Sequence, residues 1–208
     1  LADYLQAKAI LFESLASSVP KAGVLKLAVL NRDDEQSYEY LQDMLQVEYV
    51  DYGLQLDASV TADNIRRYGT GNRFDIHADG ESFSVETELM GNYNVANCLA
   101  AIAVARKGLG VPVEAVKVGI STMPAIPGRM ERIDLGQDFE AMVDFAHTPH
   151  ALCAILGAVR NESVGRIIVV FGSGGLRDVA KRSWMGSVAA EMADIVVITA
   201  EDPRTESL

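Results

Sequence analysis

The sequence has few cysteines, few prolines and a single tryptophan, and it has no long apolar run. Its two cysteines, Cys98 and Cys153, both lie in apolar runs with helical spacing, so we expect buried, reduced thiols instead of a disulfide. No stretch is long and apolar enough to span a bilayer, and no signal peptide opens the chain. The sequence therefore predicts a cytoplasmic protein with no membrane span.

Basic residues are also scarce. The chain has 18 lysines and arginines against 29 aspartates and glutamates, which gives a net charge of −11. This balance argues against a nucleic-acid partner, because such a partner requires a basic face. It does not exclude a small, negatively charged substrate, because a few local arginines can hold phosphates or carboxylates on an acidic protein.

The length of 208 residues suits two domains, and the first part mixes helical and β-type patterns. Asp33 or Asp34 is suited to cap a helix that ends at Met44. We expect helices over 1–15, 34–44, 92–108 and 112–122, and strands over 24–30, 47–52, 64–68, 73–78 and 83–89. Glycines separate the later β-type runs, which predicts an antiparallel patch between residues 47 and 89.

A segment with two prolines and a glycine, Met123 to Gly128, is the predicted domain boundary, so the domains are 1–128 and 129–208. Beyond it we expect strands over 130–135, 139–145, 166–171 and 195–200, with helices over 149–160 and 180–193. The alternation of strand and helix at the end predicts parallel strands with right-handed crossovers.

Asp144 and His147 follow a predicted strand, and the carboxyl ends of strands in α/β proteins open onto the ligand crevice. A carboxylate at Asp144 can accept hydrogen bonds from both hydroxyls of a ribose. His147 either lines the same crevice or simply begins a helix. Arg129, at the boundary, is either an interdomain salt-bridge residue or a fork of donors for phosphate oxygens.

Asn94 and Asn97 lie at the start of a predicted helix. Helix capping explains Asn94, but Asn97 lies a turn inside, where asparagine is a poor helix former and its amide suits the edge of a purine. Lys8 interrupts an apolar helical stripe that also contains Leu5 and Phe12. It either extends its amine to solvent or is desolvated, in which case the neutral amine can take up carbon dioxide as a carbamate.

The loop Phe171 to Asp178 contains three glycines between a strand and a helix. Such a loop can hold an anion with its backbone N–H groups, although a tight turn explains it equally well. It lacks the dinucleotide fingerprint and the phosphate-loop pattern that ends in Lys-Ser/Thr.

Three segments together resemble the ATP-dependent Mur ligases of cell-wall synthesis: Pro127 to Glu131, Val143 to Pro149 and Glu201 to Arg204. The resemblance is greatest to the branch that adds a diamino acid to UDP-N-acetylmuramoyl-L-alanyl-D-glutamate. It runs with gaps from Ala2 to Glu206. It implies an α/β fold, with the latter part of a central P-loop-type ATPase domain and the first part of a carboxyl-terminal Rossmann-like domain.

The resemblance also implies that the ligase uses ATP and Mg²⁺, and that a muramoyl peptide and an amino acid are its substrates. Contacts to ATP would come from Asn94, Asn97, Arg129, Asp144 and Lys181, the last near the phosphates. His147 is a candidate for the catalytic crevice.

The same resemblance implies that a carbamylated Lys8 helps to place Mg²⁺, and that Arg177 and Arg204 bind the incoming amino acid. Asp202 stands where the family has asparagine, so it is expected to contact a second ammonium group of that amino acid. Leu176 and Glu201 also depart from the family pattern, at positions where aspartate is usual.

The family's phosphate loop, its metal-binding glutamate and its UDP-binding domain are not found in these residues, so we interpret the chain as an inactive fragment of a longer enzyme. Open strand edges in such a fragment favour self-association. Three alternatives stay open. They are a related ligase such as a folylpolyglutamate or cyanophycin synthetase, a nicotinamide-dependent oxidoreductase, and a non-catalytic binding module.

Overall fold

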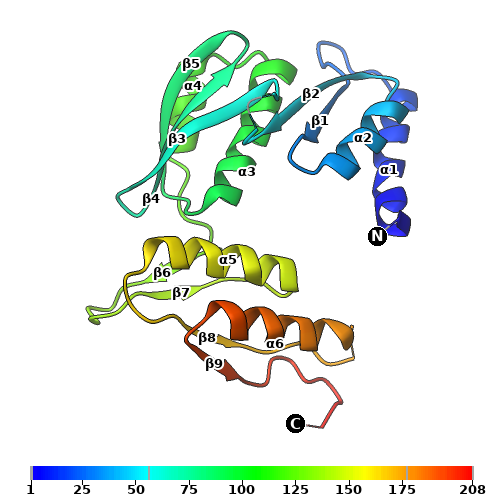
Figure 1. Cartoon of the computed structure of the whole chain (residues 1–208). Coiled ribbons are helices and arrows are strands. Elements are labelled where there is room, and N and C mark those ends of the chain that lie inside the picture. Colours follow the sequence, from blue (N-terminus) through cyan, green and yellow to red (C-terminus); the bar gives the residue numbers. More distant parts are fainter. Residues whose placement is uncertain (1, 56, 177, 208) are drawn as a thin grey trace. The chain divides into compact units, whose positions relative to one another are not determined.

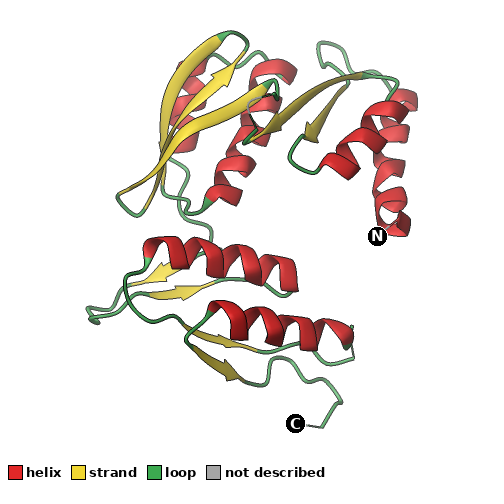
Figure 2. Ribbon diagram, in the orientation of Figure 1, coloured by secondary structure: helices red, strands yellow, loops and turns green. Residues whose placement is uncertain are grey.

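Figure 1 shows the chain as a computed structural model, which describes residues 2–55, 57–176 and 178–207. Contacts divide the chain into two compact units, residues 1–124 and 125–208. The division falls inside the segment Met123 to Gly128, which contains the two prolines and the glycine. Each unit combines helices with strands, as the red and yellow ribbons in Figure 2 show.

The first unit is built around a five-stranded sheet in the order β1-β2-β3-β4-β5. Its helices are α1 (Ala2–Ser17), α2 (Glu35–Met44), α3 (Asn92–Ala103), the π-helical turn η1 (Val104–Gly108) and α4 (Val113–Ser121). Its strands are β1 (Leu27–Asn31), β2 (Glu48–Gly53), β3 (Val60–Tyr68), β4 (Gly71–Ala78) and β5 (Glu81–Thr87).

Strand direction in this sheet changes at β3. Strands β1, β2 and β3 pair in parallel, whereas β3, β4 and β5 pair antiparallel. The predicted antiparallel patch is therefore wrong for its first run, because β2 is parallel to both neighbours. The connection through α2 explains the parallel pairing of β1 with β2, since a crossover helix returns the chain to the same end of the sheet.

Local sequence signals set several of these elements. Asp34 caps α2 with a side-chain oxygen that accepts a hydrogen bond from the Ser37 amide at 3.3 Å, as predicted. The hairpin between β4 and β5 turns at Asp79 and Gly80, whose φ angles are 54° and 76°. Two successive positive φ values are the requirement of the tight hairpin turn that Asp-Gly favours.

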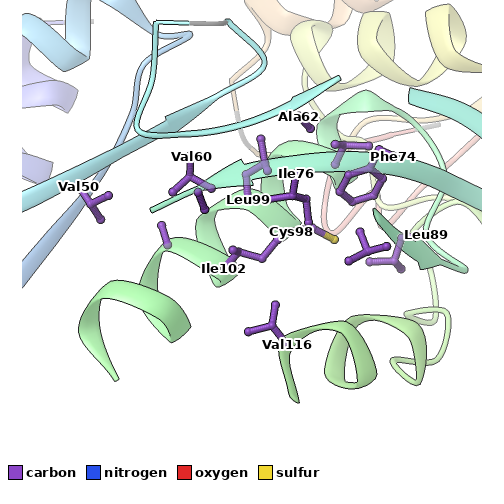
Figure 3. Packing of buried hydrophobic residues seen from close by; sticks show 14 residues of the cluster. Val50, Val60, Ala62, Phe74, Ile76, Leu89, Cys98, Leu99, Ile102 and Val116 are labelled. Atoms are coloured by element: carbon purple, nitrogen blue, oxygen red, sulfur yellow. The ribbon is translucent and has the colours of Figure 1, made fainter. Parts of the chain in front are cut away.

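Helix α3 packs across the sheet and provides the main core of the first unit, which Figure 3 shows from close by. Phe74 and Ile76 of β4 and Leu99 of α3 are at most 1% exposed. The other labelled side chains of this core are Val50, Val60, Ala62, Leu89, Cys98, Ile102 and Val116. Burial of this apolar surface is the main stabilising contribution in the unit.

The second unit has two small sheets. Strands β6 (Glu131–Ile133) and β7 (Ala141–Val143) pair antiparallel, whereas β8 (Ile168–Phe171) and β9 (Ile195–Ile198) pair in parallel. Helix α5 (Pro149–Glu162) lies between β7 and β8 in the chain, and α6 (Ala180–Met192) lies between β8 and β9. The parallel prediction is confirmed for β8 and β9. The parallel prediction is wrong for β7. In the described residues β7 pairs antiparallel with β6, because the short turn at Gly136 reverses the chain between the two strands.

Helices α5 and α6 cover one face of the β8–β9 pair. The buried side chains there are Leu152, Leu156, Ile167, Met185 and Ala189. The register places Ile168 beside Ile195 and Val170 beside Val197, and all four of these side chains are exposed. Side chains alternate between the two faces of a strand, so the second face of this pair is apolar and open to solvent.

The two cysteines differ, which corrects the prediction that both are buried. Cys98 lies in the α3 core, and its burial raises the pKa of the thiol to about 11. Cys153 is exposed on α5. The reason is the helical spacing, because Leu152 and Leu156 occupy the covered face of α5 and turn Cys153 away from it.

This difference predicts selective labelling. At pH 8 a thiol-reactive disulfide reagent should modify Cys153 and leave Cys98 unmodified, because only the thiolate reacts and Cys98 is both buried and difficult to ionise. One equivalent should react in the folded chain and two after denaturation. Cys153→Ser should abolish the rapid reaction. If one equivalent of the reagent still reacted rapidly with Cys153→Ser, Cys153 would not be the accessible thiol.

Asp194 links the helical layer to the sheet of the second unit. Its Oδ2 accepts hydrogen bonds from the Ile167 amide at 2.7 Å and from Arg160 Nη2 at 2.9 Å. The amide of Ile167, and then Arg160, lower the pKa of the Asp194 carboxyl. A carboxyl whose pKa is lower in the folded than in the unfolded state stabilises the fold above the unfolded pKa, which is about 3.9.

We therefore expect Asp194 to contribute stability at neutral pH that is lost as the pH falls below about 4. Asp194→Asn should lower the unfolding midpoint at pH 7 and reduce the loss of stability between pH 4 and pH 3. Fluorescence of Trp184, the only tryptophan and part of α6, reports unfolding of this unit. Asp138→Asn is the control at an exposed aspartate, and an equal effect there would contradict the role of Asp194.

Candidate nucleotide and substrate site

Asp144 joins the segment that enters β6 to the loop that leaves β7. It follows β7 directly, and the register places Val143 opposite Glu131. Its Oδ2 accepts a hydrogen bond from the Met130 amide at 2.8 Å, and its Oδ1 accepts one from the Ala146 amide at 2.7 Å. The half-buried carboxylate thus fixes both the entry to β6 and the loop that leaves β7.

Three side chains form a row beside this carboxylate. The guanidinium carbon of Arg129 lies 4.9 Å from the centroid of the Phe145 ring, and this ring lies 4.9 Å from the His147 ring in an edge contact. An arginine over an aromatic face is stabilised by the ring's quadrupole. Phe145 is 60% exposed. Sequence reasoning missed this residue, although an aromatic side chain between the two predicted site residues is a signal that was available.

Lys181 connects helix α6 to the same loop. Its Nζ donates a hydrogen bond to the backbone oxygen of His147 at 3.0 Å. The second unit therefore brings together four residues that the sequence singled out, although they come from three separate stretches: Arg129, Asp144, His147 and Lys181. Each of the four either belongs to the loop after β7 or contacts it.

The glycine loop after β8 packs against the segment after β9. A Cβ atom at Gly175 would lie 2.1 Å from the backbone oxygen of Pro203, and one at Gly172 would lie 2.6 Å from the oxygen of Thr199. The Gly175 amide also donates to the backbone oxygen of Asp202 at 3.0 Å. Close backbone packing is therefore enough to explain both glycines, without an anion in the loop.

Glu206 holds these two segments together. Its carboxylate accepts hydrogen bonds from the Leu176 amide and from Arg182 Nη2, both at 2.7 Å. The Leu176 amide, and then Arg182, lower the pKa of this carboxyl. Sequence reasoning did not single out Glu206, because an isolated glutamate near a loop carries no pattern.

Asp202 and Arg204 lie on the segment that Glu206 holds, and both side chains are exposed. Arg204 Nε lies 3.6 Å from Asp202 Oδ2, a long contact between solvent-exposed charges that contributes little to stability. Both residues adopt positive φ angles, 32° and 53°. The prediction for Arg177 lies outside the described residues.

In the first unit, Asn94 and Asn97 form a pair at the start of α3. Asn94 is buried, and its amide nitrogen donates to the Met90 oxygen at 2.8 Å. Asn97 is exposed, and its Nδ2 donates to Asn94 Oδ1 at 3.2 Å. The cap of α3 is Gly91, without a side-chain hydrogen bond, so the capping explanation for Asn94 is wrong. Asn94 instead anchors the turn and orients Asn97.

Lys8 lies on the exposed side of α1, with Nζ 5.4 Å from the Tyr4 ring centroid. Ala9 is the buried residue, with Leu5 and Phe12 packed beside it. Leu5 and Phe12 of the predicted stripe therefore lie on the covered face of α1, with Ala9 between them, and the solvent-facing alternative for Lys8 is the one observed.

Among residues 2–55, 57–176 and 178–207, no group of three histidine, cysteine or acidic side chains is arranged to hold a metal ion. In the same ranges, no helix has the length and apolar character needed to cross a bilayer.

Two protein-family models match the chain. The Mur ligase middle domain matches residues 1–105, and the Mur ligase glutamate ligase domain matches residues 128–208. Matches to solved structures agree with these assignments. A UDP-N-acetylmuramoyl-L-alanyl-D-glutamate–2,6-diaminopimelate ligase is 31% identical with a TM-score of 0.63, and the match covers 98% of this chain and 41% of that one. The Mycobacterium tuberculosis folylpolyglutamate synthase shares the fold, with a TM-score of 0.71 at 20% identity over 83% of this chain and 38% of that one.

Curated relatives match over almost the whole chain. The UDP-N-acetylmuramoyl-L-alanyl-D-glutamate–2,6-diaminopimelate ligase of Thermosynechococcus vestitus is 41% identical over 210 residues, which covers 100% of this chain and 40% of the relative. The UDP-N-acetylmuramyl-tripeptide synthetase of a Roseiflexus species is 39% identical over 208 residues. That match covers 98% of this chain and 41% of the relative. The chain thus spans about two fifths of the length of these relatives. By both its domain matches and its sequence identity, the chain belongs to the Mur ligase family.

Proposed function

We propose that this chain is part of a cytoplasmic, ATP-dependent ligase that adds an amino acid to UDP-N-acetylmuramoyl-L-alanyl-D-glutamate in peptidoglycan synthesis. The observation that carries the proposal is the gathering of Arg129, Asp144, His147 and Lys181 around one loop at the end of β7. Identity of about 40% to relatives with that activity in their names supports it.

The reaction requires an activated carboxyl group, because a carboxylate is a poor acyl donor. ATP would transfer its terminal phosphoryl group to an oxygen of the substrate carboxylate, which releases ADP and gives an acyl phosphate. The amine of the incoming amino acid would then attack the carbonyl carbon and expel phosphate, which leaves an amide. Mg²⁺, when bound, would offset charge on the transferred phosphoryl group.

Arg129 and Lys181 supply the positive charge for the phosphates in this proposal. Phe145 contacts the guanidinium of Arg129 from one side and leaves its planar fork of donors available to phosphate oxygens. Lys181 is held beside the same loop through the His147 oxygen. Each Asp144 oxygen accepts one backbone hydrogen bond, and a carboxylate oxygen can accept two, so a ribose hydroxyl can still bind there.

The remaining roles follow the same reasoning. Asn97 is exposed and oriented by Asn94, and its amide can pair with the edge of adenine. Arg204 and Asp202 would select the amino acid, with the guanidinium for a distal carboxylate and the acid for a second ammonium group. His147 would line the catalytic crevice. Lys8, exposed on α1, would take part in Mg²⁺ placement only after carbamylation.

Removal of the charge and the donor fork of Arg129 tests the nucleotide role. In the full-length enzyme, Arg129→Gln should raise the KM for ATP at least tenfold, because a fork of donors to phosphate oxygens is lost. The measurement is amino-acid-dependent phosphate release over a range of ATP concentrations. Arg166→Gln removes the same charge from an exposed position in the same unit and should leave the KM unchanged. An unaltered KM in Arg129→Gln would exclude the contact.

The choice of amino acid is tested separately. Phosphate release by the full-length enzyme should occur with the UDP-muramoyl dipeptide and only one of lysine, ornithine and diaminopimelate. If diaminopimelate is the substrate, Arg204→Gln should lower kcat/KM for it by a factor of ten or more, since a bond to its distal carboxylate is lost. Failure of all three amino acids to support release would rule out the muramoyl assignment.

A further inference from the structure

Two arginines stand directly opposite each other on neighbouring strands of the first unit. The register pairs Arg66 of β3 with Arg73 of β4. Residues in such a pair have Cβ atoms about 5 Å apart and point to the same face of the sheet, and like charges there are destabilising. Two guanidinium groups in this arrangement therefore need compensation, either from acids of the sheet or from a bound anion.

A β-bulge produces the pairing. Asp63 pairs with Asp75 and Arg66 pairs with Arg73, so β3 advances three residues where β4 advances two. Asn64, inside the bulge, has a φ of 50°. A shift of one residue moves a side chain to the other face of a strand, so without the bulge Arg66 would not share a face with Arg73. Bulges commonly redirect side chains beside binding sites.

The neighbouring acids compensate these charges only in part. Glu86 of β5 meets Arg73 at one contact of 3.5 Å, and both side chains are more than a third exposed to solvent, at 38% and 45%. Such an exposed pair is weak. Asp75 accepts hydrogen bonds from Ser84 and from Asn64, and these bonds, more than the charges of the two arginines, lower its pKa.

The two arginines also border a cavity that is open to solvent on one side. It has a volume of about 490 Å³ and is lined by Asn64, Ile65, Arg66, Arg73, Phe74 and Asp75. This volume lies in the range of small-molecule sites, about 300–1,000 Å³. The guanidinium of Arg73 also lies 5.7 Å from the centroid of the Tyr68 ring, a contact that restrains its position.

We propose that Arg66 and Arg73 bind the phosphate group of a small phosphorylated molecule in this cavity. A terminal phosphate offers three oxygens and a charge close to −2, which matches two planar forks of donors. A single carboxylate offers two oxygens and neutralises only one arginine. All residues of this site belong to the first unit, and none of them has a role in the function proposed above.

Inorganic pyrophosphate is the probe. The 208-residue chain, titrated at constant ionic strength and followed by calorimetry and amide NMR, should bind it saturably, with shifts at the amides of β3 and β4. Arg66→Gln and Arg73→Gln should each weaken the affinity at least fivefold. Lys117→Gln on α4 removes the same charge elsewhere in this unit, and Arg166→Gln removes one from an exposed position in the second unit. Neither control should change the affinity.

Three outcomes would overturn the proposal: no saturable binding, an equal loss of affinity in Lys117→Gln, or saturable binding that Arg66→Gln and Arg73→Gln leave unchanged. Glutamate at the same concentration should bind at least tenfold more weakly than pyrophosphate, and equal binding would contradict a phosphate site. Removal of one arginine of a like-charged pair should not unfold the sheet. Circular dichroism of each variant verifies this, and Arg66→Lys, which keeps the charge without the fork, should bind with intermediate affinity.

Discussion

The second unit depends on a single carboxylate that accepts two backbone hydrogen bonds. Asp144 joins the Met130 amide, before β6, to the Ala146 amide, after β7. A three-residue pair of strands has few hydrogen bonds of its own, so this clamp keeps the ends of the strands together. Because the loop after β7 is fixed in this way, the side chains that extend from it keep a defined arrangement. The aromatic support of Arg129 and the contact of Lys181 both depend on that loop.

Much of the local structure could be predicted from the sequence, because it depends on patterns that are short in range. The cap at Asp34, the hairpin at Asp79 and Gly80, and the helix that begins at Pro149 are each set by a few neighbouring residues. The grouping of the candidate site residues was predictable for a different reason. Loops at the ends of strands carry function in α/β folds, and the resemblance to the Mur ligases supplied the pattern of residues.

What the sequence misplaced or left open involves information that no local pattern contains. The position of Lys8 depends on how far α1 is rotated against the sheet, and a rotation by one residue exchanges it with Ala9. Cys153 was misplaced because an apolar run does not tell which face of a helix is covered. The pairing of Arg66 with Arg73 requires the bulge in β3, and a bulge is set by the whole ladder of strand pairs.

The tight packing of Gly172 and Gly175 has a mechanical consequence. No side chain separates the loop after β8 from the segment that carries Asp202 and Arg204, and Glu206 joins that segment to the start of α6. The loop, the segment and the start of α6 are therefore packed and hydrogen-bonded to one another. A molecule that pulled on Arg204 would also displace the first turns of α6, and with them the ammonium group that holds the loop of Asp144. Binding at Arg204 would in this way be felt at the loop after β7 through a short chain of direct contacts.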